Sequence, residues 1–278
     1  MPALDPETFE AIIESALEED IGRGDLTSVA VLPEGARLRF AMTTRQDIVP
    51  AGLDLAMAIF KRLAPAADIE KKIADGAAAA AGTVLMILDG PARGLLSAER
   101  TALNMVQFLS GIATTTRAYV DAIDGTGAIL LDTRKTVPGL RALSKYATAV
   151  GGARNHRMRL DDGILIKDNH IAVAGSIGEA VRRAQAAGLA DIEVECDTLD
   201  QVKQALAAGV RRILLDNMSN DELREAVALV GDKAALEASG GVTLETIRGI
   251  AKTGVDFVSV GRITQSAPAV DIGLDQLA

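Results

Sequence analysis

The sequence predicts two parts of mixed α and β structure: a small α+β domain with an antiparallel sheet, followed by the consecutive βα units of a barrel. Residues 38–88 carry short apolar runs separated by turn residues, which is typical of an antiparallel sheet. From about residue 128 onward, short apolar runs alternate with helical patterns instead, and the later runs begin about 20 residues apart. Strands separated by helices of this length indicate a parallel sheet.

The first part contains two predicted strands and a long helix. Residues 38–43 alternate in the manner of a half-buried strand, and 83–88 form a second apolar run that we expect to end in a turn at 89–91. The alanines of 77–81 are too few for a stable helix and predict a loop or strand entry. Ser97 is the predicted N-cap of a helix whose apolar stripe recurs at helical spacing.

The second part contains six predicted barrel strands, at 129–131, 164–166, 192–194, 213–215, 234–236 and 257–260. Helical patterns separate the later strands and often stop at glycine, at 177–187, 199–208, 221–230 and 244–253. Catalytic groups of such barrels lie at the C-terminal ends of the strands. The reactive residues found there are Asp132, Thr133, Arg134, Lys135, Lys167, Glu195, Asp216, Glu237 and Arg262.

Composition narrows the class of partner. The chain has 278 residues, of which 49% are hydrophobic and 24% charged, as in a soluble globular protein, and no apolar run approaches the ~20 residues needed to span a bilayer. A net charge of −9 and 3% aromatic residues argue against a nucleic acid or an anionic membrane as partner. Cys196 is the single cysteine, and the first 19 residues do not resemble a signal peptide, so the cytoplasm is the expected compartment.

One segment opposes the overall charge. Residues 132–170 hold eight Lys or Arg against four Asp, together with both histidines, His156 and His170. A solvated basic face is the simplest interpretation of such a cluster, but Lys135 and Lys167 follow predicted barrel strands and should converge on the barrel mouth. A cationic mouth in an acidic protein predicts a small ligand with several negative charges.

Two glycine-containing segments predict a phosphate site. Residues 239–241 lead into the predicted helix 244–253, with Thr243 as its N-cap, and 261–262 follow the last strand. Glycine lets backbone N–H groups approach an anion, a helix N-terminus favours negative charge, and barrels often hold phosphate in these last loops.

Two acidic strand-end residues have other uses. Glu195 and Asp216 could hold Mg²⁺ that arrives on a phosphate, hydrogen-bond sugar hydroxyls, or stabilise a cationic sugar. One cysteine and two clustered histidines do not match a zinc site, so no metal of the protein's own is predicted. We expect Cys196 to point into the packing layer rather than to act as a nucleophile.

At these residues the chain resembles the quinolinate phosphoribosyltransferase (decarboxylating) family, over nearly its whole length. The matching motifs are EDIGRGDLTS at 19–28, GPAR at 90–93, AERTALN at 98–104, DTRKTVPGLR at 132–141, NHR at 155–157, IKDNH at 166–170, LDNM at 215–218 and EASGG at 237–241. So many motifs in one order are not expected by chance. The chain departs from the usual family pattern at Arg262 and Gln265, where Ala and His are more common, and at Ala153, where a third Gly is usual.

The resemblance implies a fold and a reaction. The fold is an N-terminal α/β sandwich domain at 1–110, to which a C-terminal tail at 266–278 returns, and an incomplete, about seven-stranded α/β barrel domain at 111–265. The reaction converts quinolinate and phosphoribosyl pyrophosphate (PRPP) to nicotinate mononucleotide, pyrophosphate and CO₂ in NAD biosynthesis, with Mg²⁺. The implied assembly is a homodimer or higher homo-oligomer with shared active sites.

The resemblance also implies roles for individual residues, carried over by motif. The quinolinate site is lined by Arg100, Arg134, His156, Arg157 and Lys167. The side chains that face PRPP and its Mg²⁺ are Lys135, Glu195 and Asp216, and Thr133 is a further substrate-binding residue. The phosphate cradle consists of Ser239, Gly240, Gly241, Val260, Gly261 and Arg262. The expected catalytic residues are Lys135, Lys167, Glu195 and Asp216.

Arg100 poses a geometric problem. It lies on the predicted helix before the first barrel strand, so no βα loop of its own barrel carries it to the mouth. The simplest geometry places the first domain of one subunit over the barrel mouth of its partner in a two-fold dimer.

Three other functions stay open. They are a paralogous phosphoribosyltransferase of altered substrate, such as one tied to molybdate uptake genes, a non-catalytic phosphate-ligand sensor on a decayed barrel, and an aldolase-type Schiff-base enzyme that uses Lys167. The intact pairs at 134–135 and 156–157 disfavour the first. The presence of Glu195, Asp216 and Lys167 disfavours the second.

Overall fold

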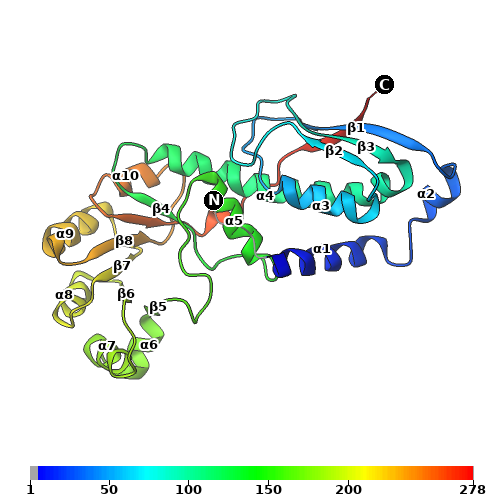
Figure 1. The fold of residues 1–278 in the computed structure, drawn as a ribbon. Coiled ribbons are helices and arrows are strands. Elements are labelled where there is room, and N and C mark those ends of the chain that lie inside the picture. The colour runs from blue at the N-terminus through cyan, green and yellow to red at the C-terminus, as the bar shows by residue number, and fades with distance from the viewer. Residues whose placement is uncertain (1–5, 278) are drawn as a thin grey trace. The chain divides into compact units, whose positions relative to one another are not determined.

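The computed structural model describes residues 6–277 of the chain, and these divide into two compact units (Figure 1). The first unit comprises the residues up to 117, 142–152, and those from 267 onward. The second comprises 118–141 and 153–266. Segment 142–152 thus groups with the first unit, although it lies within the range predicted for the barrel; the domain ranges 1–110 and 111–265 stay a prediction.

The first unit is built on a four-stranded antiparallel sheet in the order β10-β1-β3-β2. Its centre is the pair β1 (Arg37–Thr44) and β3 (Val84–Pro91), and β2 (Asp68–Lys71) forms one edge. The other edge is β10 (Ile272–Gln276), which comes from the far end of the chain and pairs with β1. The predicted antiparallel sheet is therefore present, and residues 77–81 form a loop that touches it through the bridge between Ile48 and Ala79.

The helices of this part are α1 (Pro6–Ile21), α2 (Leu26–Val31), α3 (Leu53–Leu63), α4 (Ala92–Ala122) and α5 (Arg141–Gly151). Among them, α3 buries one face through Leu55, Ile59 and Phe60, each at most 1% exposed. Apolar residues at this helical spacing supply much of the unit's core.

Two predictions about the first part are wrong. No turn closes the second strand at 89–91, because β3 continues through Pro91; Gly90 permits this, since a Cβ there would lie 2.6 Å from that of Ala67. Ser97 does not cap α4, because the helix begins five residues earlier, at Ala92. The Ser97 hydroxyl lies inside the helix instead, within 2.9 Å of the Arg93 carbonyl and of a carboxylate oxygen of Asp25.

The second unit is built on a six-stranded parallel sheet in the order β4-β9-β8-β7-β6-β5. The strands are β4 (Ile129–Leu131), β5 (Ile164–Ile166), β6 (Ile192–Cys196), β7 (Arg212–Asp216), β8 (Ala235–Ser239) and β9 (Phe257–Ser259). The first strand pairs with the last, as a barrel requires, but the barrel is not closed. The expected seventh strand is present among the described residues only as an isolated parallel bridge between Leu131 and Arg154.

The helices of the second unit are α6 (Asp168–Ala174), α7 (Ile177–Ala186), α8 (Leu199–Ala207), α9 (Asn220–Val230), the 3₁₀ turn η1 (Gly231–Lys233), α10 (Ile247–Ala251) and α11 (Arg262–Gln265). Three of them match the predicted ranges to within one residue. The helix predicted over 244–253 does not, because Thr243 and Thr246 close a turn first, with the Thr243 N–H donating to the Thr246 hydroxyl at 2.9 Å.

Alternation along the parallel strands separates core from site. On β6, Ile192, Val194 and Cys196 belong to the apolar core of the second unit. Since successive strand residues point to opposite faces, Glu193 and Glu195 face the barrel interior. Burial raises the pKa of the Cys196 thiol to about 12, which fits the expected packing role and not that of a nucleophile.

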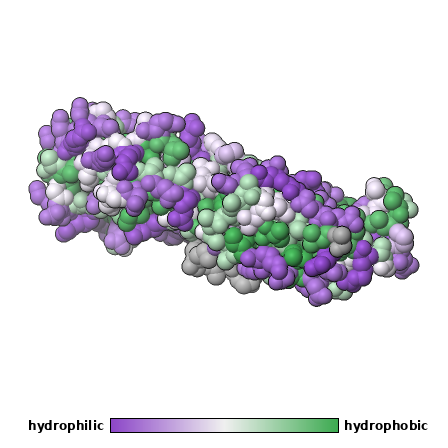
Figure 2. Space-filling model, turned by 90° about the horizontal axis from the view of Figure 1, so that it is seen from above, coloured by the Kyte–Doolittle hydropathy of each residue, from purple (hydrophilic) through white to green (hydrophobic). Residues whose placement is uncertain are grey.

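The surface is mixed in polarity. Figure 2 shows hydrophilic and hydrophobic residues interspersed over the visible face, with hydrophobic atoms at its right-hand edge, where Figure 1 places α2. That helix exposes Leu26, Val29 and Val31. Within residues 6–277, no helix has the length and apolar character needed to cross a membrane.

Candidate active site

A cavity of about 590 Å³ opens in the second unit, where the parallel strands end. It brings together all the predicted site residues except Arg100: Thr133, Arg134, Lys135, His156, Arg157, Lys167, Glu195, Asp216, Ser239, Gly240, Gly241, Val260, Gly261 and Arg262. Arg100 lies on α4 in the first unit, with an exposed side chain. The cavity also contacts residues that the sequence interpretation did not assign to the site, namely Leu165, Leu214, Asn217, Val242, Thr243, Ser259 and Gln265, as well as the strand-end residues Asp132 and Glu237.

The cavity has an excess of uncompensated positive charge. Within the described residues, the side chains of Arg134, Lys135, Arg157 and Arg262 form no ion pair. The Nε of Arg134 is buried and has no hydrogen-bond partner. Burial and the neighbouring charge of Arg134 lower the pKa of Arg157. Cations held this close without counterions favour an anionic ligand.

Lys167 leaves the end of β5 and forms an ion pair with Glu195 at the end of β6. The Glu195 side chain is 11% exposed, so the pair is partly shielded from water. The Lys167 backbone is fixed separately, because its N–H donates to Nδ1 of His170 at 3.0 Å. His170 therefore stabilises the start of α6 and is not part of the cavity lining.

Asp216 ends β7 in an electrostatically unfavourable place. Burial and the carboxylate of Asp197 raise its pKa, although Lys167, Asn217 and Lys135 oppose the rise. Asn217 orients the carboxylate, with Nδ2 donating to Oδ2 of Asp216 at 2.7 Å. Asn217 does so from a left-handed backbone conformation, with φ of 55°.

Two glycines of the cavity wall, Gly240 and Gly261, have no room for a side chain. Gly240 has φ of 94°, and a Cβ there would lie 2.2 Å from Oδ1 of Asn217. A Cβ on Gly261 would lie 2.8 Å from Cδ of Lys135. These two loops therefore present backbone to the cavity, as a phosphate cradle needs.

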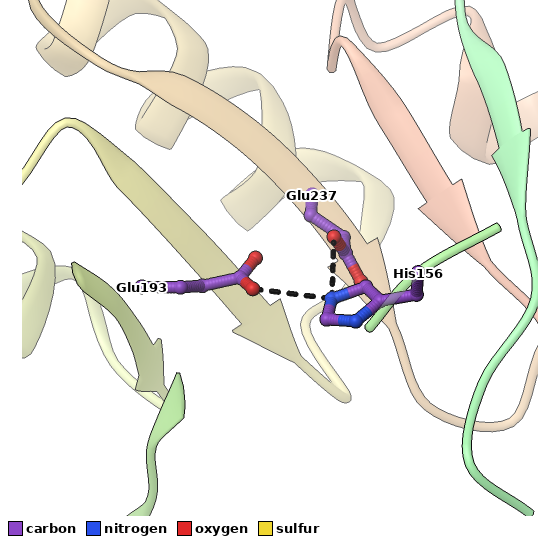
Figure 3. A group of neighbouring side chains, drawn as sticks. All are labelled: His156, Glu193 and Glu237. Carbon is purple, nitrogen blue, oxygen red and sulfur yellow. Dashed lines mark hydrogen bonds and ion pairs between the residues drawn. The ribbon is translucent and has the colours of Figure 1, made fainter. Parts of the chain in front are cut away.

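A layer of charged residues lies below the cavity, inside the barrel. Glu193 pairs in register with Arg212 in the β6–β7 ladder, and Glu237 pairs with Phe257 in the β8–β9 ladder. The carboxylates of Glu193 and Glu237 both point at the imidazole of His156 (Figure 3). Glu237 was expected at a strand end, but β8 runs on to Ser239 and leaves Glu237 fully buried in the middle of the strand.

His156 joins this layer to the cavity. Its Nε2 lies 3.1 Å from Oε2 of Glu193 and 3.5 Å from Oε2 of Glu237. Burial lowers the pKa of His156, but hydrogen bonds to these two carboxylates and their charges outweigh burial and raise it to about 9. The N–H of Arg157 donates to Nδ1 at 2.8 Å and favours the neutral ring, yet two full charges exceed one peptide dipole, so the net direction is upward.

His156, Glu193 and Glu237 lie close enough together to suggest a metal site, since their ligand atoms are within 4.8 Å of one another. The hydrogen bonds do not fit one. Nδ1 of His156 already accepts the Arg157 N–H, so the proton of a neutral ring sits on Nε2, and that nitrogen cannot ligate. Arg212 also binds both carboxylates, through contacts of 2.9 Å to Glu193 and 2.7 Å to Glu237.

The sequence interpretation missed Glu193 and Arg212. A signal was available for Glu193, because it lies two residues before Glu195 in an otherwise apolar strand and must share its face. No comparable signal marks Arg212, since charged residues are common at the start of a strand.

Known proteins match the chain over nearly its full length. A family model for the N-terminal domain of quinolinate phosphoribosyl transferase matches residues 25–110, and one for the C-terminal domain matches 112–275. A Mycobacterium leprae (strain TN) protein named nicotinate-nucleotide pyrophosphorylase (carboxylating) is 44% identical over 270 residues, covering 95% of each chain. A Nicotiana glauca protein named quinolinate phosphoribosyltransferase (decarboxylating) 2, mitochondrial, is 38% identical, covering 98% of this chain and 83% of that one.

A solved structure has the same fold. The nicotinate-nucleotide pyrophosphorylase from Francisella tularensis superposes with a TM-score of 0.95 at 38% identity, covering 99% of this chain and 98% of that chain. The predicted combination of an antiparallel-sheet domain and an open α/β barrel is therefore confirmed.

Proposed function

Because the chain belongs to the quinolinate phosphoribosyltransferase family, we propose that it transfers the phosphoribosyl group of PRPP to quinolinate. The transfer proceeds with decarboxylation and gives nicotinate mononucleotide, pyrophosphate and CO₂, a step of NAD biosynthesis. One observation carries the proposal beyond family membership: a single cavity holds unpaired cations together with strand-end carboxylates. Two anionic substrates and a cationic transition state need both.

On the quinolinate side, Arg134, Arg157 and Lys167 bind the two carboxylates of the pyridine ring, with His156 beside them. Arginine suits this role because its planar fork matches a carboxylate. Lys167 is held as an ammonium by Glu195, and an ammonium is not the nucleophile that a Schiff base requires. This ion pair supports the transferase over an aldolase-type function.

On the PRPP side, Lys135, Glu195 and Asp216 face the pyrophosphate and the ribose. As pyrophosphate leaves, the anomeric carbon gains oxocarbenium character, which nearby carboxylates stabilise. Asp216 and Glu195 are oxygen donors of the kind Mg²⁺ prefers, and the raised pKa of Asp216 fits a site that gains from a cation. Mg²⁺ bound to PRPP would neutralise the charge of the leaving pyrophosphate.

The chemical sequence needs no organic cofactor. The ring nitrogen of quinolinate attacks the anomeric carbon, and the bond to pyrophosphate breaks. The nitrogen is then quaternary, so the ring accepts the electron pair released when the adjacent carboxylate leaves as CO₂, and that carbon takes a proton. The site contributes mainly by positioning the ring nitrogen in line with the breaking bond.

The phosphate of PRPP occupies the backbone cradle of 239–241 and 260–262. A side chain on Gly240 or Gly261 would displace Asn217 or Lys135 beside this cradle, and Arg262 supplies a charge where the family more often has alanine. Gln265 takes the place of the usual histidine and lines the same cavity.

Arg100 completes the quinolinate site from a second subunit in a homodimer or larger assembly of the cytoplasm. Among the described residues, those that line the cavity all belong to the second unit, whereas Arg100 belongs to the first. A two-fold dimer in which each first domain covers its partner's cavity would build two shared sites.

Co-expression of Arg100→Ala with Lys167→Ala tests this shared site. In a mixed dimer one site then holds both residues and the other holds neither. Random pairing makes about half the dimers mixed, so about a quarter of the wild-type activity returns. A mixture as inactive as its parents, with mixed dimers confirmed by mass, would contradict the shared site.

The reaction itself is tested by incubating the purified protein with quinolinate, PRPP and Mg²⁺. We expect nicotinate mononucleotide and pyrophosphate in equal amounts. A folded, dimeric protein that binds both substrates and yields neither product would support the sensor instead.

A further inference from the structure

The charged layer below the cavity has no role in the reaction described so far. Glu193 is 4% exposed and Glu237 is fully buried. Buried carboxylates carry a large desolvation cost unless they are paired and hydrogen-bonded. Apolar residues would fill these inward positions of β6 and β8 at lower cost, as they do elsewhere in barrels.

Arg212 holds the two carboxylates together. Its Nε donates to Oε1 of Glu193 at 2.9 Å, and its Nη2 donates to Oε2 of Glu237 at 2.7 Å. The guanidinium also lies over the ring of Phe257, 4.9 Å from the centroid, which fixes its plane. Glu193 therefore contacts Arg212 through Oε1 and turns Oε2 toward His156, whereas Glu237 contacts both residues through the same oxygen, Oε2.

His156 connects the charged layer to the cavity residue Arg157. Its ring contacts Glu193 through Nε2 and accepts the Arg157 N–H through Nδ1. The backbone N–H of His156 donates to Oδ1 of the buried Asp132 at 2.8 Å. The backbone that carries Arg157 into the cavity is thus held from one side by Asp132 and from the other by the imidazole.

We propose that Glu193, Arg212 and Glu237 are a positioning assembly for the substrate's carboxylates: they fix the imidazole of His156, and through it Arg157, at the cavity. Glu237 is part of the cavity lining, whereas Glu193 and Arg212 are not, and we assign all three an action through His156 rather than on the substrate. The inference rests on the proposed function in one respect, namely that Arg157 binds quinolinate.

The charges that face the imidazole explain the choice of residues. Glu193 from β6 and Glu237 from β8 face Nε2 and hold a proton there, while Arg212 from β7 keeps the two carboxylates from repelling each other. The carboxylate of Asp132, which follows β4, accepts the backbone N–H of His156. The backbone N–H of Arg157 donates to Nδ1 of the ring. Since Nδ1 accepts the Arg157 N–H, the ring proton lies on Nε2, the nitrogen that faces both carboxylates.

The test compares Glu237→Gln with wild type and with Glu179→Gln, a half-buried carboxylate on α7 that pairs with Arg182 and Arg183 and serves as the control. For Glu237→Gln we expect the KM for quinolinate to rise by about tenfold or more, with the KM for PRPP and kcat changed by about twofold or less. The control should match wild type in all three.

A second readout does not depend on turnover. The chain has only two histidines, so NMR of histidine-labelled protein resolves both, and His170→Gln assigns them. The titration midpoint of His156 should fall by about one pH unit or more in Glu237→Gln, because one of the two carboxylates facing the ring is lost. Arg212→Lys should raise the same KM, since a single ammonium cannot bridge both carboxylates in the same geometry.

The outcomes separate cleanly. An unchanged quinolinate KM and an unchanged His156 midpoint in folded Glu237→Gln would overturn the inference. A fall in kcat and a rise in both KM values, in proportion to the loss of thermal stability, would also overturn it. That is the pattern expected of a merely structural layer. If Glu237→Gln does not fold, Glu193→Gln carries the same two readouts. A wild type that forms no product would refute the proposed function alone, because the NMR shift still reports on the assembly.

Discussion

Nicotinate differs from quinolinate by one missing carboxylate, and the cavity should discriminate strongly between them. Arg134, Arg157 and Lys167 supply more positive charge than one carboxylate can pair, and the buried Nε of Arg134 has no hydrogen-bond partner among residues 6–277. With nicotinate bound, at least one guanidinium loses a two-pronged contact. At roughly 1.5 kcal/mol or more for each charged hydrogen bond, the loss is about 3 kcal/mol, or roughly a hundredfold in kcat/KM.

The assay measures kcat/KM for both acids at the same saturating PRPP and Mg²⁺. Wild type should use quinolinate at least about a hundredfold better than nicotinate. Arg157→Lys should lose much of its activity toward quinolinate, because an ammonium cannot reproduce the fork. Arg159→Lys is the matched control, since Arg159 is exposed and pairs only with Asp161 among the ion pairs of the described chain. Comparable turnover of nicotinate by wild type would refute the reasoning about paired charges.

Three further outcomes are expected. Glu195→Ala and Asp216→Ala should abolish turnover while quinolinate binding, measured by calorimetry, survives; folded variants that no longer bind quinolinate would place these residues on the wrong side of the site. The raised pKa of Asp216 means that its ionised form destabilises the fold, and that stability falls as pH rises through its folded-state pKa. Asp216→Asn should therefore raise Tm at pH 7 and lose that advantage in acid near the ordinary pKa of 3.8, whereas an equal or lower Tm at pH 7 would contradict the shift. Gly240→Ala should cost about 2 kcal/mol or more of unfolding free energy, and Gly178→Ala, inside α7 with open space around it, should cost little; equal Tm values for the two would show that the contact with Asn217 relaxes freely.

The sequence predicts most of the barrel because the parallel strands are short apolar runs with clear helical separators. The residues that follow them could be assigned to one mouth from topology alone, and one cavity does collect Lys135, Lys167, Glu195 and Asp216. What failed were element boundaries. Gly90-Pro91 resembles a turn, but close packing against Ala67 keeps it in the sheet, and Ser97 resembles a cap, but its hydroxyl bonds back to Arg93 inside the helix.

The contacts of the buried charged layer could not be predicted from the residues at strand ends. Glu193 and Glu237 lie inside their strands and Arg212 begins its own, and their contacts depend on the register between β6, β7 and β8. Register is a property of tertiary structure, and the local sequence specifies it only through the alternation of faces. The role of Arg100 is set at another level, the assembly of subunits, which the topology of a single chain does not contain.

The central claim is that one cavity joins phosphoribosyl transfer to decarboxylation. The most direct measurement follows ¹⁴CO₂ released from quinolinate labelled in its 2-carboxylate, together with nicotinate mononucleotide, in the presence and absence of PRPP. We predict CO₂ and nicotinate mononucleotide in a one-to-one ratio, and no CO₂ without PRPP, because the ring accepts the electron pair only after its nitrogen has become quaternary. Release of CO₂ without PRPP, or a nucleotide product that keeps both carboxylates, would contradict this account.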